Sequence, residues 1–246
     1  MFLTGAVPVV VAILVLTRVE EPDKWQKSEA SQVHHGHPLR EIFGSVYRVR
    51  TVVACALLTI AIIGLWAGAV YEPSAVIQLA TKAGASKAQA IRTASIATGI
   101  LSIGTILGCL ALPPLAERIG RKWTLAVYFA GMAVTIAASF GWAFYLENGL
   151  VPFIALLFVL GFFGGNFALF SLWLPEQFGT RVRATAFAFC TSFGRFVGAG
   201  VNFLLGAAVL NMHTLGTPVA LTALAFVAGL LIIPFAPETK GKTLPT

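Results

Sequence analysis

The sequence predicts an all-α polytopic membrane protein, and its composition is the first reason. Of the 246 residues, 57% are apolar and only 11% are charged, and the mean hydropathy is +0.85. A soluble domain carries about 25% charged residues. The apolar residues also fall into long runs, and about 20 of them in a helix cross the hydrocarbon core of a bilayer. We therefore expect about seven transmembrane helices with a lipid bilayer as their surroundings.

Six apolar runs are long enough to span a bilayer upright. They cover residues 51–79, 93–115, 124–145, 150–174, 184–210 and 218–235. A seventh run at residues 2–17 reaches only about 24 Å as a helix. No basic stretch precedes this run and no small-x-small site follows it, so it is not typical of a signal peptide. A truncated or tilted helix is the interpretation that we favour.

Basic residues divide the connecting segments into two classes. Thirteen Lys and Arg residues lie on one set of alternate sides and three on the other, and Arg195 lies within a run. The positive-inside rule places the richer side, with the carboxyl terminus, in the cytoplasm. The net charge of +7 is explained by this topology, so no nucleic-acid partner is expected. The three cysteines lie in separate runs and the His-rich stretch 34–37 lacks further ligands, so we expect no metal and no cofactor.

Local signals add detail to this topology. Residues 39–43 resemble a short interfacial helix before the 51–79 run. Pro73 removes a backbone hydrogen bond, so we expect a break there that leaves residues 74–79 as a separate outer turn. Glycines spaced by four, as in Gly104 with Gly108 and Gly161 with Gly165, predict close helix packing.

The loop at residues 115–122 reads Leu-Ala-Glu-Arg-Ile-Gly-Arg-Lys. It resembles the G-x-L-a-D-r-x-G-R-k motif of the major facilitator superfamily (MFS). Gly120 permits the positive φ of a tight turn. Two positions depart from the motif: Pro113 stands for its first glycine, and Glu117 replaces its aspartate.

Three further strings complete the resemblance. Glu176 and Arg183 have the E-x6-R spacing of sugar and organic-acid porters, and residues 237–242 and 19–25 resemble the cytoplasmic caps that close the two halves of these proteins. The resemblance implies the C-terminal half of an MFS transporter of the sugar and organic-acid (metabolite:H+ symporter) type. It assigns residues 1–18 to part of the sixth of twelve helices, 19–50 to the central cytoplasmic loop, and 51–246 to the six-helix half.

On this interpretation the charged loop residues form a cytoplasmic gate. Glu176 would end one helix and pair with Arg183 at the start of the next, and the other members would complete a network around this pair. The expected gate residues are Glu117, Arg118, Arg121, Glu176, Arg183 and Glu238.

Five residues within the runs are candidates for substrate binding or coupling, because polar groups inside a membrane are costly. Arg195, near mid-bilayer, either binds an anionic substrate or has a structural role. Glu72 either binds a proton or substrate, or is solvated in the outer third. Asn166 and Asn202 either face a cavity or hydrogen-bond between helices, and Trp66 either lines a cavity or packs.

The resulting prediction is a secondary active transporter that works by alternating access, with proton coupling implied by the resemblance. Sugar porters typically carry a paired-Gln motif in the first helix of this half, and the only glutamine of the 51–79 run is Gln78. A small organic acid is therefore favoured, and a sugar or polyol porter is the alternative. No hydrolase or metalloprotease motif occurs, so we do not expect an enzyme. We expect a multi-pass protein of a bacterial inner membrane that needs an N-terminal half or self-association, or else a truncated or split subunit inactive alone.

Overall fold

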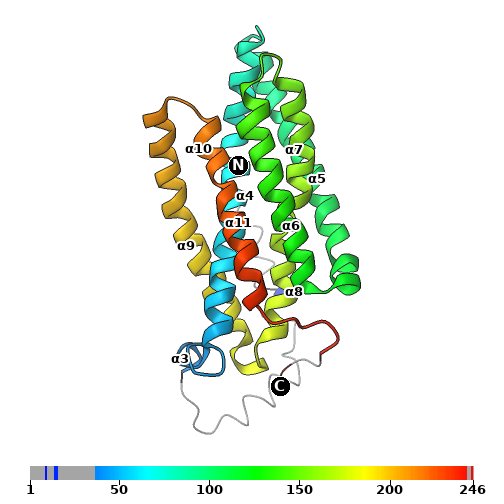
Figure 1. Cartoon of the computed structure of the whole chain (residues 1–246), viewed down its shortest axis with the longest axis vertical. Helices are drawn as coiled ribbons and strands as arrows, with labels where there is room; N and C mark the ends of the chain where they lie inside the picture. Colours follow the sequence, from blue (N-terminus) through cyan, green and yellow to red (C-terminus); the bar gives the residue numbers. More distant parts are fainter. Residues whose placement is uncertain (1–8, 10–13, 16–36, 243–244, 246) are drawn as a thin grey trace. The chain divides into compact units, whose positions relative to one another are not determined.

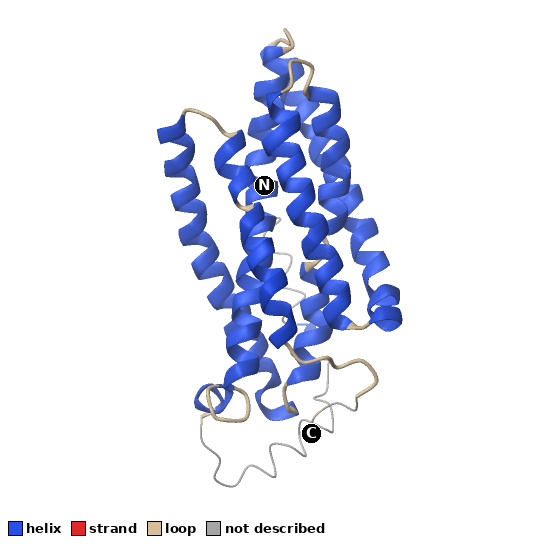
Figure 2. Cartoon of the chain, viewed as in Figure 1, coloured by secondary structure: helices blue, strands red, loops and turns tan. Residues whose placement is uncertain are grey.

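The computed structural model describes residues 9, 14–15, 37–242 and 245. Contacts divide the chain into two units, Met1–His37 and Pro38–Thr246, and the second unit is described here. The predicted partial helix and most of the predicted central loop lie outside the described residues. Every regular element of the described part is a helix, with no strand in it (Figure 2). The all-α prediction is therefore confirmed.

The second unit contains six helical spans long and apolar enough to cross a membrane, as predicted (Figure 1). A short helix, α3, precedes them, at the place where the sequence predicted one. Three spans are single helices and three are interrupted. The bounds are α3 (Pro38–Ile42); α4 (Arg48–Lys82); α5 (Lys87–Ile119); α6 (Arg121–Ile136) continued by a π-helical turn η2 (Ala137–Trp142) and a 3₁₀ turn η3 (Ala143–Tyr145); α7 (Leu150–Gly164) with α8 (Phe167–Gln177); α9 (Thr180–Met212); and α10 (Gly216–Leu221) with α11 (Ala223–Ile232) and a 3₁₀ turn η4 (Ile233–Phe235).

The expected break at Pro73 is wrong, because α4 continues through it to Lys82. Proline removes one backbone donor, but packing of the following turns opposes a break. Ala75, Val76 and Leu79 are all buried beyond the proline. Their burial keeps the outer part of α4 in line with the rest of the helix.

Glycines allow a close helix contact between α5 and α7. A Cβ added at Gly104 or Gly108 would collide with the backbone carbonyl of Phe158 or Phe162, and one added at Gly161 would collide with that of Leu101. Any side chain there would push the two helices apart. The packing role predicted from the glycine spacing is confirmed for this pair of helices.

The spans are buried to very different extents. Within the most apolar stretch of each helix, 59% of α4 is buried but only 22% of α5 and 17% of α9. Figure 1 shows α9 and α5 at opposite edges of the view, with α4, α6 and α11 between them. Large side chains such as Ile106 on α5 and Phe203 on α9 are 60% and 79% exposed. Two of the six spans therefore present faces that this unit does not cover.

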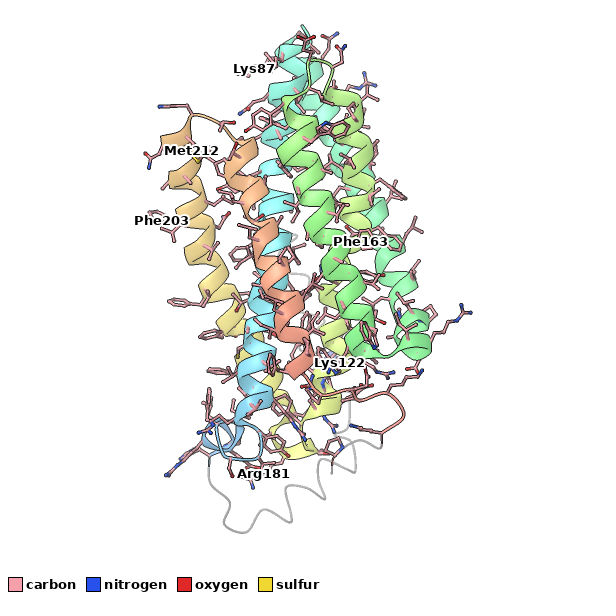
Figure 3. All side chains as sticks on the ribbon, in the orientation of Figure 1. Lys87, Lys122, Phe163, Arg181, Phe203 and Met212 are labelled. Carbon is pink, nitrogen blue, oxygen red and sulfur yellow. The ribbon has the colours of Figure 1, made fainter. Side chains whose placement is uncertain are left out.

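The two ends of the bundle also differ in charge. One end carries α3, the α5–α6 and α8–α9 turns and the residues after Phe235, and we call it the basic end. Figure 3 labels Lys122 and Arg181 at this end, and Lys87 and Met212 at the other.

Candidate functional site

A buried arginine organises the basic end. Arg121 is the first residue of α6, and its side chain is only 7% exposed. Its Nε and Nη2 donate to the two carboxylate oxygens of Glu176 on α8, at 3.0 and 2.7 Å. This bidentate geometry is the strong form of an arginine–carboxylate pair. Glu117 also contacts Nη2 at 2.9 Å, but its side chain is 64% exposed.

The amino terminus of α6 is capped by a residue more than a hundred positions away. Glu238 accepts hydrogen bonds from the backbone N–H groups of Arg121, Lys122, Thr239 and Lys240, at 3.0 to 3.1 Å. Burial raises the pKa of its carboxyl, but the four backbone hydrogen bonds outweigh burial and hold the pKa below the ordinary glutamate value. Glu238 is therefore a charged cap on a helix end that prefers negative charge.

Gly120 makes this cap possible. Its φ is +91° and its ψ is 163°, a conformation that is essentially restricted to glycine. A Cβ at this position would also lie 2.7 Å from a carboxylate oxygen of Glu238. The glycine singled out in the sequence thus serves both the turn and the close approach of the carboxylate.

The segment after Phe235 joins the same network. The Thr239 hydroxyl donates to Oε2 of Glu176, and the indole Nε1 of Trp173 on α8 donates to the Pro237 carbonyl at 3.1 Å. Three parts of the chain, the α5–α6 turn, α8 and this segment, are thereby joined through two carboxylates. We call Arg121, Glu176, Glu238 and Thr239 the basic-end network.

The expected pair of Glu176 with Arg183 is not formed. Arg183 donates instead to the carbonyls of Phe178 and Pro245, each at 3.2 Å. Arg183 lies in the first turn of α9 and satisfies the carbonyl just before that helix, while the Glu176 carboxylate binds Arg121. Arg118 is exposed and contributes its backbone carbonyl, which accepts from Nζ of Lys240 at 2.7 Å.

Several participants at this end were not predicted. Thr239 was missed because hydroxyl residues are common and carry no spacing signal. Arg50, which donates to the Gln177 carbonyl at 2.7 Å, and Arg181, which pairs with Glu41 at 2.8 Å, had counted only toward topology. The two interactions attach the start of α4 to the end of α8 and α3 to the start of α9.

Glu72 of α4 lies within the protein, which argues against the alternative that its carboxyl is solvated in the outer third of the span. It is 1% exposed. Its Oε2 accepts from the Thr98 hydroxyl of α5 at 2.9 Å, and its Oε1 is buried without a hydrogen-bond partner in the described part of the chain. The carboxyl therefore bridges two spans while one oxygen stays unsatisfied.

Asn166 lies at a break that the hydropathy pattern did not predict. The span from Leu150 to Gln177 is interrupted between α7 and α8. A Cβ at Gly165 would approach the backbone nitrogen of Cys109 at 2.9 Å, so α5 passes closely here. The amide of Asn166 donates to the Phe163 carbonyl at 2.8 Å, and its Oδ1 is buried and unpartnered among the described residues.

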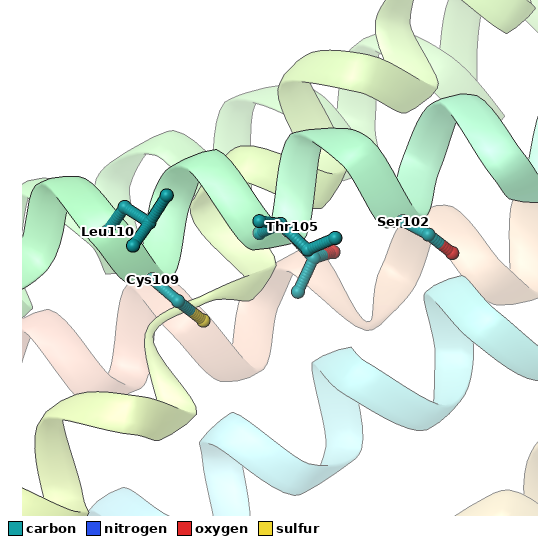
Figure 4. Close-up of a pocket in the computed structure, with 5 residues that line it drawn as sticks. Ser102, Thr105, Cys109 and Leu110 are labelled. Carbon is teal, nitrogen blue, oxygen red and sulfur yellow. The ribbon is translucent and has the colours of Figure 1, made fainter.

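A shallow groove of about 470 Å³ lies along α5 beside this break. Figure 4 shows Ser102, Thr105 and Cys109 on the same side of α5, with the α7–α8 connection passing next to Cys109. The Cys109 thiol lies 3.9 Å from the Gly165 carbonyl. Interrupted helices with free polar groups near mid-membrane are typical of substrate sites in transporters.

Two of the remaining candidates, Trp66 and Asn202, lie where α4 meets α9, and the third, Arg195, does not. Trp66 is beside Gly198, 3.9 Å from the position of an added Cβ. The Tyr71 hydroxyl donates to the Asn202 carbonyl at 3.4 Å, while the Oδ1 of Asn202 is buried and unpartnered in the described part. Arg195 is on the exposed side of α9, and no described residue forms an ion pair with it. No hydrogen bond among the described residues joins Arg195, Glu72 and Asn166.

Comparison with known proteins gives a consistent picture. The family described as "Sugar (and other) transporter" matches residues 12–246. The chain is 27% identical to the "Probable 4-methylmuconolactone transporter" of Cupriavidus pinatubonensis, over 98% of this chain and 53% of that protein. It is 30% identical to plastidic glucose transporter 4 of Arabidopsis thaliana, over 60% of this chain and 28% of that protein. It is 26% identical to the facilitated trehalose transporter Tret1 of Apis mellifera ligustica, over 61% of this chain and 31% of that protein. The chain spans about half the length of the first of these relatives.

Proposed function

The chain belongs to the sugar (and other) transporter family of the MFS, and we propose that it forms the six-helix second half of an alternating-access transporter for a small anionic metabolite. It is an integral, multi-pass membrane protein of a transporter family rather than an enzyme. In this proposal residues 51–246 form the six-helix half, preceded by a cytoplasmic central loop (19–50) and part of a sixth helix (1–18). The basic end faces the cytoplasm in this proposal, as the positive-inside rule favours, and the membrane is a bacterial inner membrane.

The observation that carries the proposal is the low burial of α5 and α9, at 22% and 17% of their most apolar stretches. These uncovered faces carry polar groups, with Ser102 and Thr105 on α5 and Arg195 on α9. Polar and charged groups facing hydrocarbon are costly. A second six-helix bundle packed on these faces would enclose them, and transporters of this kind hold substrate at the interface of their halves.

Arg195 favours an anionic substrate. It lies about 22 Å along α9 from Thr180 by the rise of an α-helix, which is near the middle of the span. A guanidinium binds a carboxylate in a bidentate manner, with two parallel hydrogen bonds. Glu72, which bridges α4 and α5, is the carboxyl that we assign to proton coupling. The polar groups near the α7–α8 break, Asn166 and the α5 groove, would orient the rest of the substrate.

The basic-end network would act as the cytoplasmic latch. It joins the α5–α6 turn, α8 and the segment after Phe235 through Glu176 and Glu238. These connections keep the cytoplasmic ends of three spans together. Alternating access by rocking of the halves needs each half to move as a body, and such a network supplies that rigidity.

A reconstitution experiment tests the proposal. The purified chain is placed in liposomes alone, or with the N-terminal six-helix half of a relative made as a separate polypeptide. Uptake of labelled carboxylic acids and of glucose is then measured, with and without an inward proton gradient. We expect carboxylate uptake only with both halves, loss of it in Arg195→Ala and partial retention in Arg195→Lys.

Three results would contradict parts of this proposal. Robust uptake by the chain alone would indicate a self-complementing dimer. Unchanged carboxylate uptake in Arg195→Ala would remove Arg195 from the site. Uptake of glucose without carboxylates would favour the second candidate, half of a sugar porter, which the relatives named as glucose and trehalose transporters support.

A further inference from the structure

A second groove lies away from the proposed substrate path, where the basic end meets the membrane-facing surface. It encloses about 690 Å³ between the start of α6 and the end of α11, within the size range of small-ligand sites. Its lining combines two lysines, one tryptophan and an apolar wall. The groove borders the latch at Glu238, but its two lysine ammonium groups and its apolar wall have no part in the latch or in the proposed substrate site.

Two lysines of the groove lining are held by backbone carbonyls. Nζ of Lys122 donates to the Pro234 carbonyl at 2.8 Å, and Nζ of Lys240 donates to the Arg118 carbonyl at 2.7 Å. Each ammonium keeps two further N–H donors. Glu238 also lines the groove, but its carboxylate accepts four backbone N–H groups at the positive end of α6. The two ammonium groups are therefore available to an anion.

The rest of the groove is mostly apolar, and residues that neighbour its lining in sequence are exposed and apolar, as a surface that contacts lipid would be. Ala126 and Leu230 line it beyond the lysines. Trp123, at its edge, is 69% exposed. Outside it, Leu231 and Phe235 are 71% and 73% exposed. Tryptophan at the level of the headgroups and lysines just outside a span are typical of the membrane interface.

We propose that this groove binds an anionic phospholipid from the leaflet on the basic side. Lys122 and Lys240 contact its phosphate, Trp123 lies beside the glycerol region, and one acyl chain follows Ala126 and Leu230. A free phosphate would use the lysines but not the apolar wall, whereas a neutral lipid would use the wall but not the lysines. Only an anionic amphiphile matches both parts.

Binding has a structural consequence for the latch. Lys122 follows Arg121 directly, and Lys240 is in the same segment as Glu238 and Thr239. A phosphate held between the two lysines connects the start of α6 to that segment. The lipid thus reinforces the contact that Glu238 makes, whether or not the chain transports anything.

Tryptophan quenching by brominated lipid tests the site directly. The full chain is reconstituted in phosphatidylcholine vesicles with increasing fractions of brominated phosphatidylglycerol or, in parallel, brominated phosphatidylcholine. The Trp123 signal is the difference between each protein and its Trp123→Phe counterpart. We expect half-quenching at a roughly tenfold lower fraction of the anionic lipid than of the neutral one.

Matched variants separate the groove from general surface charge. Lys122→Gln with Lys240→Gln keeps a donor for each carbonyl but removes both charges. It should abolish the roughly tenfold anionic preference, because about 1 kcal/mol per lysine accounts for all of it. Arg40→Gln with Arg48→Gln removes two exposed charges from the same end and should leave the preference unchanged. Ala126→Phe keeps both lysines and fills the apolar part, so it should abolish the preference for the anionic lipid in Trp123 quenching even if the lysine variant folds poorly.

Four results would overturn the proposal. Two concern the lipid preference: equal quenching of Trp123 by the two lipids, or an equal loss of the anionic preference in the arginine control. The other two are displacement of the anionic lipid by millimolar inorganic phosphate at constant ionic strength, and a Trp123 that is not quenched because it is buried between two copies of the chain.

Discussion

The polar groups at the basic end and those inside the spans are satisfied to different degrees. At the basic end, Glu176 and Glu238 together accept hydrogen bonds from two side chains and four backbone N–H groups. Inside the spans, four polar side chains each have one oxygen that is buried without a hydrogen-bond partner among the described residues. They are Glu72, Asn166, Thr191 and Asn202. Buried polar groups are usually paired, so the first region is completed by this chain and the second is suited to a ligand, a proton or another bundle.

The largest effect is expected from removing the arginine at the centre of the basic-end network. Arg121→Ala leaves Glu176 as a largely buried carboxylate without its cation, and breaking such a pair costs about 3–5 kcal/mol. Thermal unfolding of the purified protein in detergent measures the loss. Glu117→Gln removes the exposed partner of the same arginine and should cost at most about 1 kcal/mol. Similar losses in the two variants would mean that Arg121 is not organised by Glu176.

A smaller loss is expected from Gly120→Ala, because two separate penalties act there. Alanine is strained at φ +91° and ψ 163°, at a cost of about 1–3 kcal/mol. Its Cβ would also displace Glu238 from the amino terminus of α6. Gly84→Ala is the control, since Gly84 has a φ of +87° with nothing within 4 Å of an added Cβ. The unfolding temperature should fall more for Gly120→Ala, and an equal fall would remove the Glu238 contact from the explanation.

These residues also indicate what sequence can and cannot predict here. Hydropathy predicted the six full-length spans and glycine spacing predicted close helix packing, because both signals depend on short stretches of chain. That α5 packs against α7 in this way was not predicted. Three members of the basic-end network, Arg121, Glu176 and Glu238, were predicted from their loops. The pairing within the network was not predicted, because whether Glu176 binds Arg121 or Arg183 depends on how α6 packs against α8.

The missed features within the spans have a related cause. The break before Asn166 lies in an apolar run that continues on both sides, so average hydropathy does not detect it. The expected break at Pro73 is absent because residues beyond it are buried. In both places tertiary packing, rather than local preference, decides whether the helix continues.

Glu238 should make stability depend on pH at the basic end. The pKa of Glu238 is lower in the folded protein than its ordinary value, since the gain from four backbone hydrogen bonds exceeds the effect of burial. Its contribution to stability is therefore fully present above the ordinary glutamate pKa, and it is lost as the pH falls through the lower folded value. Unfolding temperatures of the wild type and Glu238→Gln should differ at neutral pH and converge on acidification. A difference in unfolding temperature that stays constant with pH would mean that the negative charge of Glu238 does not contribute, and that the substitution acts through side-chain geometry alone.

The smallest effect on stability is expected inside the spans, from Glu72→Gln. A carboxyl without a cation partner in a membrane span is costly when charged, so the neutral amide should replace it with a change within about 1 kcal/mol. Thr98→Val is the matched comparison, because it removes the hydroxyl donor of Oε2 and should cost about 1–3 kcal/mol. In the two-half transporter, Glu72→Gln should abolish the stimulation of uptake by a proton gradient while the fold persists. A larger loss of stability in Glu72→Gln than in Thr98→Val would instead make Glu72 a structural ion, and the contrast between the two regions would then disappear.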